Sequence, residues 1–321
     1  MSNSDKLITV IGGSGFVGRQ IVRSLAKKGY RVRAACRRPD LAGHVTTAGT
    51  PGQIALVQAN VRYPASLAAA CDGAHAVINA TGTDVSSGAQ SFDAVLVFGA
   101  EAVARAAKGK LLITISGIGA DAESTSAAAR AKAAGERAAA KAFPGAMVLR
   151  PSVIFGPDDR FFNKTAALAR LLPILPLFGG GTAKLQPVYV GDVADAAVAL
   201  VERDVADGKA YELGGPDVMT YAEVMQYVFD TLLRKGLLLS VPKPLAKLLG
   251  TIAGFLPGAL LTADQVELIT IDNVVSETAI KEGRTLAGLG ITARAIAGIV
   301  PTYLYRYRKE GQFTVPSGKP E

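Results

Sequence analysis

The sequence predicts an α/β fold, a doubly wound parallel sheet with a smaller mixed C-terminal cap domain. Two observations support the sheet. Short apolar runs alternate with amphipathic segments over the first 156 residues, as strands and helices do in a parallel sheet. A glycine-rich turn joins the first run to the first amphipathic segment. The cap is predicted by a third observation, since the alternation stops after Gly156, where Pro and Leu crowd the chain.

Six strands are expected in the first part of the chain, each an apolar or β-branched run bounded by glycine or polar residues. They lie at 6–11, 31–36, 52–61, 75–82, 111–119 and 145–156. The first helix begins at Phe16, where apolar residues change to helical spacing, and ends at Gly29. A later helix is expected at 91–107.

The domain organisation follows from where the alternation resumes. A helix and a short strand at 186–215 are expected to return to the main sheet. The first domain is therefore predicted to comprise 1–157 with 186–215, and the cap and docking domain 158–185 with 216–310. The segment 311–321 is expected to be an extended tail.

Composition limits the partners. The 35 Lys and Arg exceed the 27 Asp and Glu, and this net charge of +8 favours anionic partners such as a phosphorylated cofactor, anionic lipid or an acidic subunit. No nucleic-acid-binding motif is present. Two cysteines in core-like stretches indicate a reducing compartment, and two histidines give no basis for a metal site. No targeting segment fits before the first strand, so we expect a bacterial-type cytoplasmic protein or a processed chain.

Gly12, Gly15 and Gly18 form a G-x-x-G-x-x-G pattern between the first strand and the first helix. Such a turn brings backbone amides and the positive end of a helix to a pyrophosphate, so it predicts dinucleotide binding. An ordinary tight turn is the alternative. The other residues expected at the dinucleotide from this turn are Ser14, Phe16, Val17 and Arg19.

The end of the second strand predicts which dinucleotide is bound. An acidic residue there accepts a hydrogen bond from the ribose 2′-hydroxyl of NAD, whereas Arg suits the 2′-phosphate of NADP. This strand ends in Arg37 and Arg38, with no acid before Asp40, which favours NADPH or NADP⁺. The alternative is a solvated surface pair. Asn60 and Val61 are expected near the adenine, and Ala80, Thr81 and Gly82 near the second ribose.

These landmarks resemble the short-chain dehydrogenase/reductase superfamily, in its extended and atypical branch. The resemblance rests on "GGSGFVG", "NATG" and "LRPSVIFGPDDR". The run from Ala133 to Asn163, with "QPVYVGDVADA" after it, is similar to the NADPH-binding accessory subunits of respiratory complex I. The resemblance implies a Rossmann fold, and adds the following residues to the expected cofactor site: Ser116, Lys132, Pro151, Ser152, Val153 and Ile154.

The resemblance also shows what is missing. Active members carry a Tyr four residues before the helix Lys, on the same helix face, as acid and base. Here that position is Ala128. We therefore expect no catalytic residue, while Lys132 keeps a role at the ribose; a solvated helix lysine is the alternative. For Ser116, orienting a carbonyl and satisfying backbone at a strand end are equally open.

The second half is expected to dock on partners. The stretch Leu237–Leu261 is apolar with interspersed Pro and Lys, and the run Pro301–Gly311 alternates Tyr with Arg. Closing the cofactor cleft is the alternative for the first stretch. The expected protein is a non-catalytic subunit of the NADH:quinone oxidoreductase, bound to subunits of the peripheral arm and membrane boundary. It would lie on the cytoplasmic side of a bacterial inner membrane, or the matrix side of mitochondria. A free NADP-dependent reductase or epimerase, or an NADPH-sensing adaptor, are the rivals.

Overall fold

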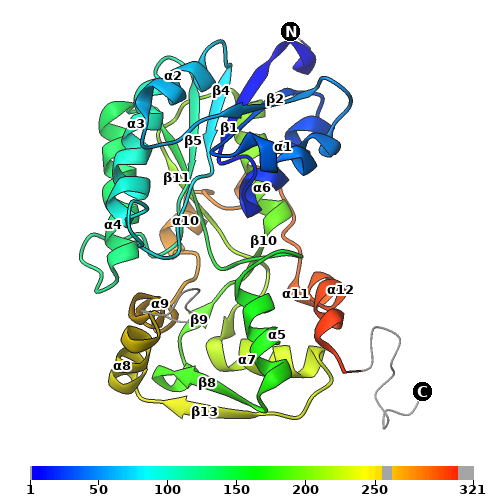
Figure 1. Cartoon of the computed structure of the whole chain (residues 1–321), viewed down its shortest axis with the longest axis vertical. Helices are drawn as coiled ribbons and strands as arrows, with labels where there is room; N and C mark the ends of the chain where they lie inside the picture. Colours follow the sequence, from blue (N-terminus) through cyan, green and yellow to red (C-terminus); the bar gives the residue numbers. More distant parts are fainter. Residues whose placement is uncertain (1, 255–261, 310–321) are drawn as a thin grey trace. The chain divides into compact units, whose positions relative to one another are not determined.

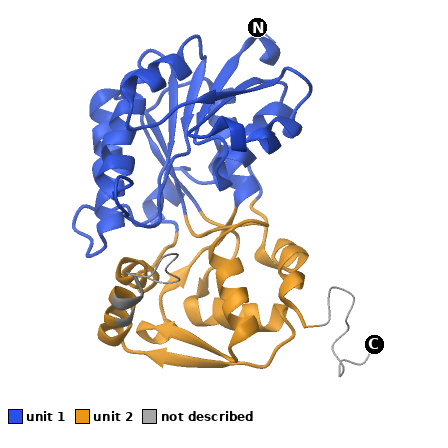
Figure 2. Cartoon of the chain, in the orientation of Figure 1, with its two compact units in different colours: residues 1–151, 190–213, 275–292 blue, residues 152–189, 214–274, 293–321 orange. Residues whose placement is uncertain are grey.

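The computed structural model describes residues 2–254 and 262–309, which form two compact units (Figures 1 and 2). Unit 1 comprises 1–151, 190–213 and 275–292, and unit 2 comprises 152–189, 214–274 and 293–321. The expected tail at 311–321 lies outside the described residues, as does 255–261.

Unit 1 contains one seven-stranded sheet, in the order β11-β6-β5-β4-β1-β2-β3, with every neighbouring pair parallel. All carboxyl ends of these strands therefore meet at one edge. The first six strands in chain order, β1 to β6, overlap the six predicted ones. The strands are β1 Leu7–Ile11, β2 Arg31–Cys36, β3 Ile54–Gln58, β4 Ala76–Asn79, β5 Leu111–Ile115, β6 Met147–Pro151 and β11 Ala210–Leu213.

Helices cover both faces of the sheet, as a doubly wound fold requires (Figure 1). On one face α1 (Phe16–Lys27) packs against α6 (Val190–Arg203). On the other, α2 (Pro64–Cys71), α3 (Phe98–Ala106) and α4 (Ala127–Ala142) enclose a core of small and aliphatic side chains. The helix expected at 91–107 starts as a π-helix, η4 (Asp93–Val97). The remaining helical turns of unit 1 are η1 Asn3–Asp5, η2 Pro39–Leu41, η3 Gly43–Ala48, α10 Glu277–Lys281 and η6 Ala287–Leu289.

Two features of unit 1 differ from the prediction. The strand expected at 145–156 ends at Pro151, which has no N–H to continue a ladder. The segment 275–292, expected in the cap, belongs to unit 1. It is held along β11, because the backbone N–H of Ser276 donates to Glu212 Oε2 at 2.7 Å and that of Glu212 donates to Arg284 O at 2.9 Å.

Unit 2 is built from short strand pairs and helices around its own core. The pairs are β7 with β10, β8 with β13, and β9 with β12. Phe155, Phe162 and Phe229 are fully buried in this core. The strands are β7 Ile154–Phe155, β8 Ile174–Phe178, β9 Lys184–Leu185, β10 Val188–Tyr189, β12 Met219–Thr220 and β13 Leu237–Val241. The helices are α5 Phe161–Leu171, η5 Gly179–Gly181, α7 Tyr221–Thr231, α8 Lys243–Gly254, α9 Ala263–Ile269, α11 Ile296–Ile299, α12 Pro301–Leu304 and η7 Tyr305–Tyr307.

The Tyr and Arg run near the C-terminus has mainly internal partners. The Tyr303 hydroxyl donates to the buried carboxylate of Asp159 at 2.6 Å. The Tyr307 hydroxyl donates to Asn163 Oδ1 at 3.2 Å, and Arg308 Nε donates to the Thr231 carbonyl at 2.9 Å. These contacts use the side chains to attach the segment to unit 2.

The basic residues of the other expected docking stretch are also paired. The ammonium groups of Lys243 and Lys247, on α8, both contact the buried carboxylate of Glu267, on α9. They therefore hold α8 against α9. Among the helices that the structure describes, none is long and apolar enough to cross a membrane.

Candidate nucleotide site

The glycine turn sits at the carboxyl edge of the unit 1 sheet, between β1 and α1. Gly12 has a φ of +81°, and a Cβ there would lie 2.8 Å from the carbonyl oxygen of Ala80. A Cβ on Gly18 would lie 2.1 Å from the Gly12 oxygen. Both distances are shorter than real Cβ contacts, so the packing of the turn against the end of β4 and of α1 against the turn admits only glycine at these two positions. Gly13 is a third constraint that the sequence pattern missed, since its Cβ would meet Ala34 at 2.9 Å.

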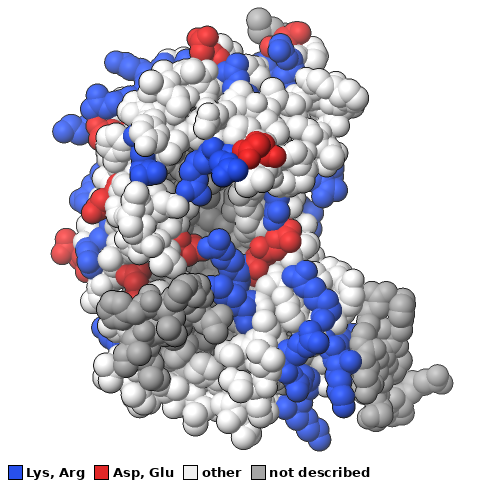
Figure 3. All heavy atoms as spheres, in the orientation of Figure 1, with Lys and Arg blue, Asp and Glu red and all other residues white. Residues whose placement is uncertain are grey.

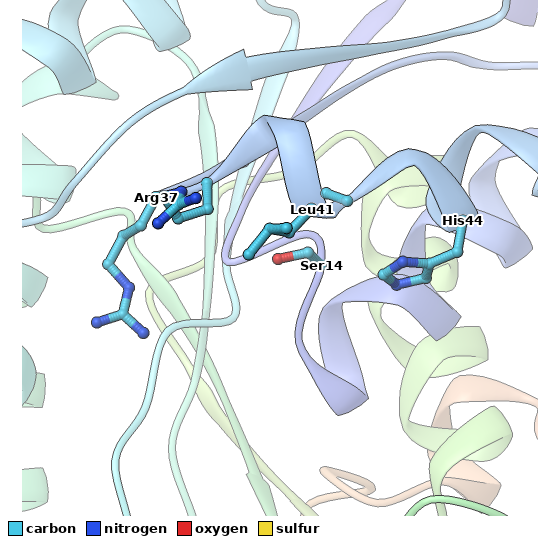
Figure 4. A pocket seen from close by; sticks show the side chains of 6 residues that line it. Ser14, Arg37, Leu41 and His44 are labelled. Atoms are coloured by element: carbon cyan, nitrogen blue, oxygen red, sulfur yellow. The ribbon is translucent and has the colours of Figure 1, made fainter.

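A pocket of about 410 Å³ opens beside this turn (Figure 4). It is lined by Ser14 from the turn, Arg37 and Arg38 after β2, and residues from the helical turns that follow. In Figure 4, Ser14 lies between Arg37 on one side and His44 on the other, with Leu41 beside it. The pocket therefore brings Ser14 of the glycine turn together with the two arginines after β2. The lining residues that sequence reasoning missed are Leu41, Ala42 and His44.

The two arginines differ in their surroundings. Arg38 binds the Asp40 carboxylate through three hydrogen bonds of 2.8–3.2 Å. This bond holds the pKa of Asp40 below its ordinary value, so the carboxylate is charged at neutral pH. Within the residues that the structure describes, the exposed Arg37 forms no ion pair. Arg37 is therefore the arginine more available to an incoming anion.

The other residues expected near the adenine and ribose follow β3 and β4 at the same edge of the sheet. Asn60 Oδ1 accepts from the backbone N–H of Arg62 at 3.1 Å, while Val61 is buried against α3. Ala80 donates its N–H to Ile11 O at 2.8 Å, which ties the end of β4 to the glycine turn. The remaining two residues of this set are Thr81, half-buried, and Gly82, exposed.

Lys132 lies on α4, beside the end of β5. Its ammonium nitrogen would be only 2.9 Å from a Cβ placed on Gly117. Ala128, one turn before it, is buried with 4% exposure and has no proton to give. The three tyrosines of unit 1 lie off this helix, because Tyr30 and Tyr211 lie at the amino ends of β2 and β11, and Tyr63 precedes α2.

Ser116 is engaged in a polar network. Its hydroxyl donates to Glu136 Oε1 at 2.5 Å, and its N–H donates to the Leu149 carbonyl at 2.8 Å. Glu136 also accepts from Arg150, with Nη2 to Oε2 at 2.5 Å, and the carboxylate side chain is only 10% exposed. The network links β5, β6 and α4. Ser116 therefore already has a structural partner.

Pro151, buried, ends β6 in unit 1, while the next three expected residues belong to unit 2. Ser152 is buried there, and its hydroxyl donates to the Asn273 carbonyl at 2.8 Å. Val153 and Ile154 precede and begin β7. The described residues contain no group of His, Cys, Asp and Glu that could hold a metal ion.

Comparison with protein families agrees with this geometry. Residues 12–148 match an NAD(P)H-binding family, and residues 117–214 match the NAD dependent epimerase/dehydratase family. The fold is similar to that of the NADPH-dependent quinone oxidoreductase QOR2 of Escherichia coli in complex with NADPH, with a TM-score of 0.71, 19% identity, and coverage of 93% of this chain and 99% of that one.

Two curated relatives are similar over most of the chain. The NADH dehydrogenase [ubiquinone] 1 alpha subcomplex subunit 9 of Arabidopsis thaliana is 35% identical over 97% of this chain and 80% of its own length. The "Ceramide reductase" of Caulobacter vibrioides is 30% identical over 74% of each chain. The chain therefore belongs to the family of the complex I alpha subcomplex subunit 9, an NAD(P)-binding family with the Rossmann fold of the short-chain dehydrogenases/reductases.

Proposed function

We propose that the chain is a non-catalytic, NADP(H)-binding accessory subunit of the NADH:quinone oxidoreductase. One observation carries the proposal, namely that a glycine turn with no room for a Cβ at Gly12 or Gly18 coexists with a buried alanine, Ala128, at the position expected for the proton donor. Removing a positioned general acid typically costs 10²- to 10⁴-fold in rate. The same site can therefore retain a dinucleotide and transfer no hydride.

The residues around the pocket fit the parts of NADPH. The amides of the glycine turn and the N-terminus of α1 suit the pyrophosphate. Arg37 and Arg38 border the same pocket and suit a 2′-phosphate, through charge-assisted bonds. Lys132 and the residues after β4 suit the nicotinamide ribose. NADPH bound in this way would be a phosphorylated, tightly held ligand at the carboxyl edge of the sheet.

Such a ligand would act as a structural staple. A ligand that binds only the folded protein stabilises it by about 2.7 kcal/mol at a hundredfold excess over its dissociation constant. The subunit would then brace the peripheral arm beside the membrane and the quinone site, while NADH oxidation belongs to another subunit. The family membership supports this placement, because the curated relative is itself a complex I subunit.

The test begins with the purified full-length protein. It is denatured and the released nucleotide is identified; NADPH or NADP⁺ is expected. Native protein is then incubated with deuterated NADPH and carbonyl substrates, and no deuterium transfer is expected. Co-purification with flavin and iron–sulfur subunits from the native membrane separates a subunit from a free NADPH sensor. Release of NAD⁺ alone, or measurable turnover, would contradict the proposal.

A second candidate is a reductase that uses water or the substrate itself as the acid. The relative named "Ceramide reductase" favours it, since the match covers 74% of this chain. This candidate predicts NADPH oxidation in the presence of a lipid carbonyl substrate, and loss of that activity in Lys132→Ala. An accessory subunit would show no such NADPH oxidation. In that case Lys132→Ala would still weaken NADPH binding.

A further inference from the structure

Unit 2 exposes a group of branched aliphatic side chains on one strand pair and the helix before it. In the parallel pair of β8 and β13, Leu237 lies beside Ile174. Leu237, Leu239 and Ile174 are 70%, 58% and 42% exposed. Leu171 and Leu172, where α5 ends, are 79% and 50% exposed. We call these five residues the leucine face.

The two chain segments that carry the leucine face are joined by hydrogen bonds within unit 2. The N–H of Leu237 donates to the Pro173 carbonyl at 2.8 Å, which joins the start of β13 to the segment between α5 and β8. Arg234 Nη1 donates to the Ala169 carbonyl at 2.8 Å and also to the carbonyl of Arg170. These contacts hold the start of β13 and the residues before it against the end of α5 and the segment that follows it.

The strand pair has an inner and an outer side. Successive side chains of a strand point to opposite faces. In β8, Leu175 and Leu177 on one side of the strand are buried in the unit 2 core, with 1% and 8% exposure. On the other side, Ile174 at the start of the strand is exposed, whereas Phe178 at its end is buried, so the exposed part is confined to the start of the strand pair. The core is therefore satisfied without the leucine face, which remains outside it.

The two chain segments that carry this face are basic, although the exposed Asp230 lies just before the second. The segments 160–178 and 232–248, which contain the leucine face, include no Asp or Glu. Figure 3 shows Lys and Arg side chains gathered over the part of unit 2 where α5 and α12 lie. Arg170 directly precedes Leu171, and Lys235 lies two residues before Leu237; both side chains are exposed. Lys243 and Lys247 of the second segment are paired with Glu267 and add nothing to this positive charge. The other basic residues of the two segments are Arg160, Lys164, Arg170, Arg234 and Lys235.

We infer that the leucine face binds the surface of an anionic lipid bilayer. Exposed leucines can enter the boundary of the acyl chains while flanking cations contact headgroup phosphates. A protein partner fits less well, because interface cores are enriched in aromatic residues and Met, and the leucine face has neither. The nearby Tyr303 and Tyr307 hydroxyls are bonded within unit 2.

This binding does not require that the chain be a complex I subunit or that it hold NADPH. All of the residues involved lie in unit 2, whereas the nucleotide pocket lies in unit 1. A membrane-facing surface would serve an accessory subunit at the membrane boundary as well as a reductase of lipids. A negative result in the nucleotide experiments would therefore not contradict membrane binding. A negative result in the vesicle experiments would likewise not contradict nucleotide binding.

The test uses full-length protein and flotation with vesicles of phosphatidylcholine, alone or mixed with phosphatidylglycerol. We expect binding to the mixed vesicles that falls with added salt, and little binding to phosphatidylcholine alone. The double variant Leu171→Ser with Leu237→Ser should bind at least about tenfold more weakly. Its control is Val205→Ser with Ile280→Ser, two residues of unit 1 with 59% and 60% exposure, which should leave binding unchanged.

A second pair of variants tests the cations. Arg170→Gln with Lys235→Gln should weaken binding roughly tenfold or more, since each basic residue near an anionic surface contributes about fivefold. Arg31→Gln with Lys108→Gln removes the same charge from exposed positions of unit 1 and should have a much smaller effect. Thermal unfolding checks that every variant folds. The inference is overturned if wild-type protein does not float with anionic vesicles, or if the controls lose binding equally. Capture by a detergent-solubilised protein complex without vesicle binding would also overturn it, in favour of a protein partner.

Discussion

Replacing Arg37 with Ala is expected to weaken NADPH binding and to leave NADH binding almost unchanged. Arg37 borders the pocket beside Ser14 and forms no ion pair in the described part of the chain. Its guanidinium can therefore approach a 2′-phosphate without first leaving a carboxylate. Hydrogen bonds to charged groups contribute about 1.5–3 kcal/mol, which corresponds to about a 10- to 150-fold loss of NADPH affinity.

Arg38 should behave differently, because its guanidinium is bonded to Asp40 at 2.8 Å. Arg38→Ala should cost less NADPH affinity than Arg37→Ala. Asp40→Asn should increase NADPH affinity, since it releases Arg38 and removes a negative charge beside the expected phosphate position. NADH has no 2′-phosphate, so its affinity should not follow this order.

Titration calorimetry with NADPH and NADH, on protein freed of co-purified nucleotide, measures both affinities. Arg31→Ala is the matched control, because Arg31 is an exposed arginine at the opposite end of β2. Equal losses for NADH and NADPH in Arg37→Ala would show that the arginine supports the loop rather than reading the phosphate. No loss for either would remove Arg37 from the site.

Three further predictions concern the packing within the two units. Gly18→Ala should lower NADPH affinity at least tenfold, because its Cβ would lie 2.1 Å from a backbone oxygen of the same turn, whereas Gly298→Ala has open space and should bind normally. Tyr303→Phe should lower the free energy of unfolding by about 1–3 kcal/mol, because a buried carboxylate loses its 2.6 Å donor; Tyr305→Phe, at an exposed position, should change it little in urea unfolding. Burial raises the pKa of Cys71 from 9.0 to about 11, so iodoacetamide at pH 8 should label it only after unfolding, as mass spectrometry of the peptides would detect. Because the folded-state pKa is the higher one, the protonated thiol favours folding fully below pH 9, and that contribution is lost as pH rises to about 11.

Much of unit 1 could be predicted because its signals are local. The glycine turn, the change to helical spacing at Phe16 and the apolar runs each lie within a few residues. The four-residue spacing from Ala128 to Lys132 is also local, and a helix places both residues on one face. The structure keeps these relationships, with Lys132 beside the end of β5.

Contacts between distant segments could not be predicted in this way. The partner of Ser116 is Glu136 on α4, and Glu136 is in turn bonded to Arg150 on β6. The segment 275–292 has no strand signal, yet backbone and carboxylate hydrogen bonds attach it to β11. Nothing near His44 in the sequence indicated that it would line the same pocket as Arg37.

The sequence by itself predicted the order of strands and helices along the chain and placed an alanine, Ala128, four residues before Lys132, because each depends on neighbours along the chain. The tertiary structure alone decided how side chains are used. It assigned Tyr303 and Lys247 to internal partners, while the pairing of β8 with β13 left Leu237 and Ile174 exposed side by side. The physical reason is that burial and pairing depend on residues that folding brings together. The amino-acid sequence gives the chemistry of each side chain but not which residues will cover it.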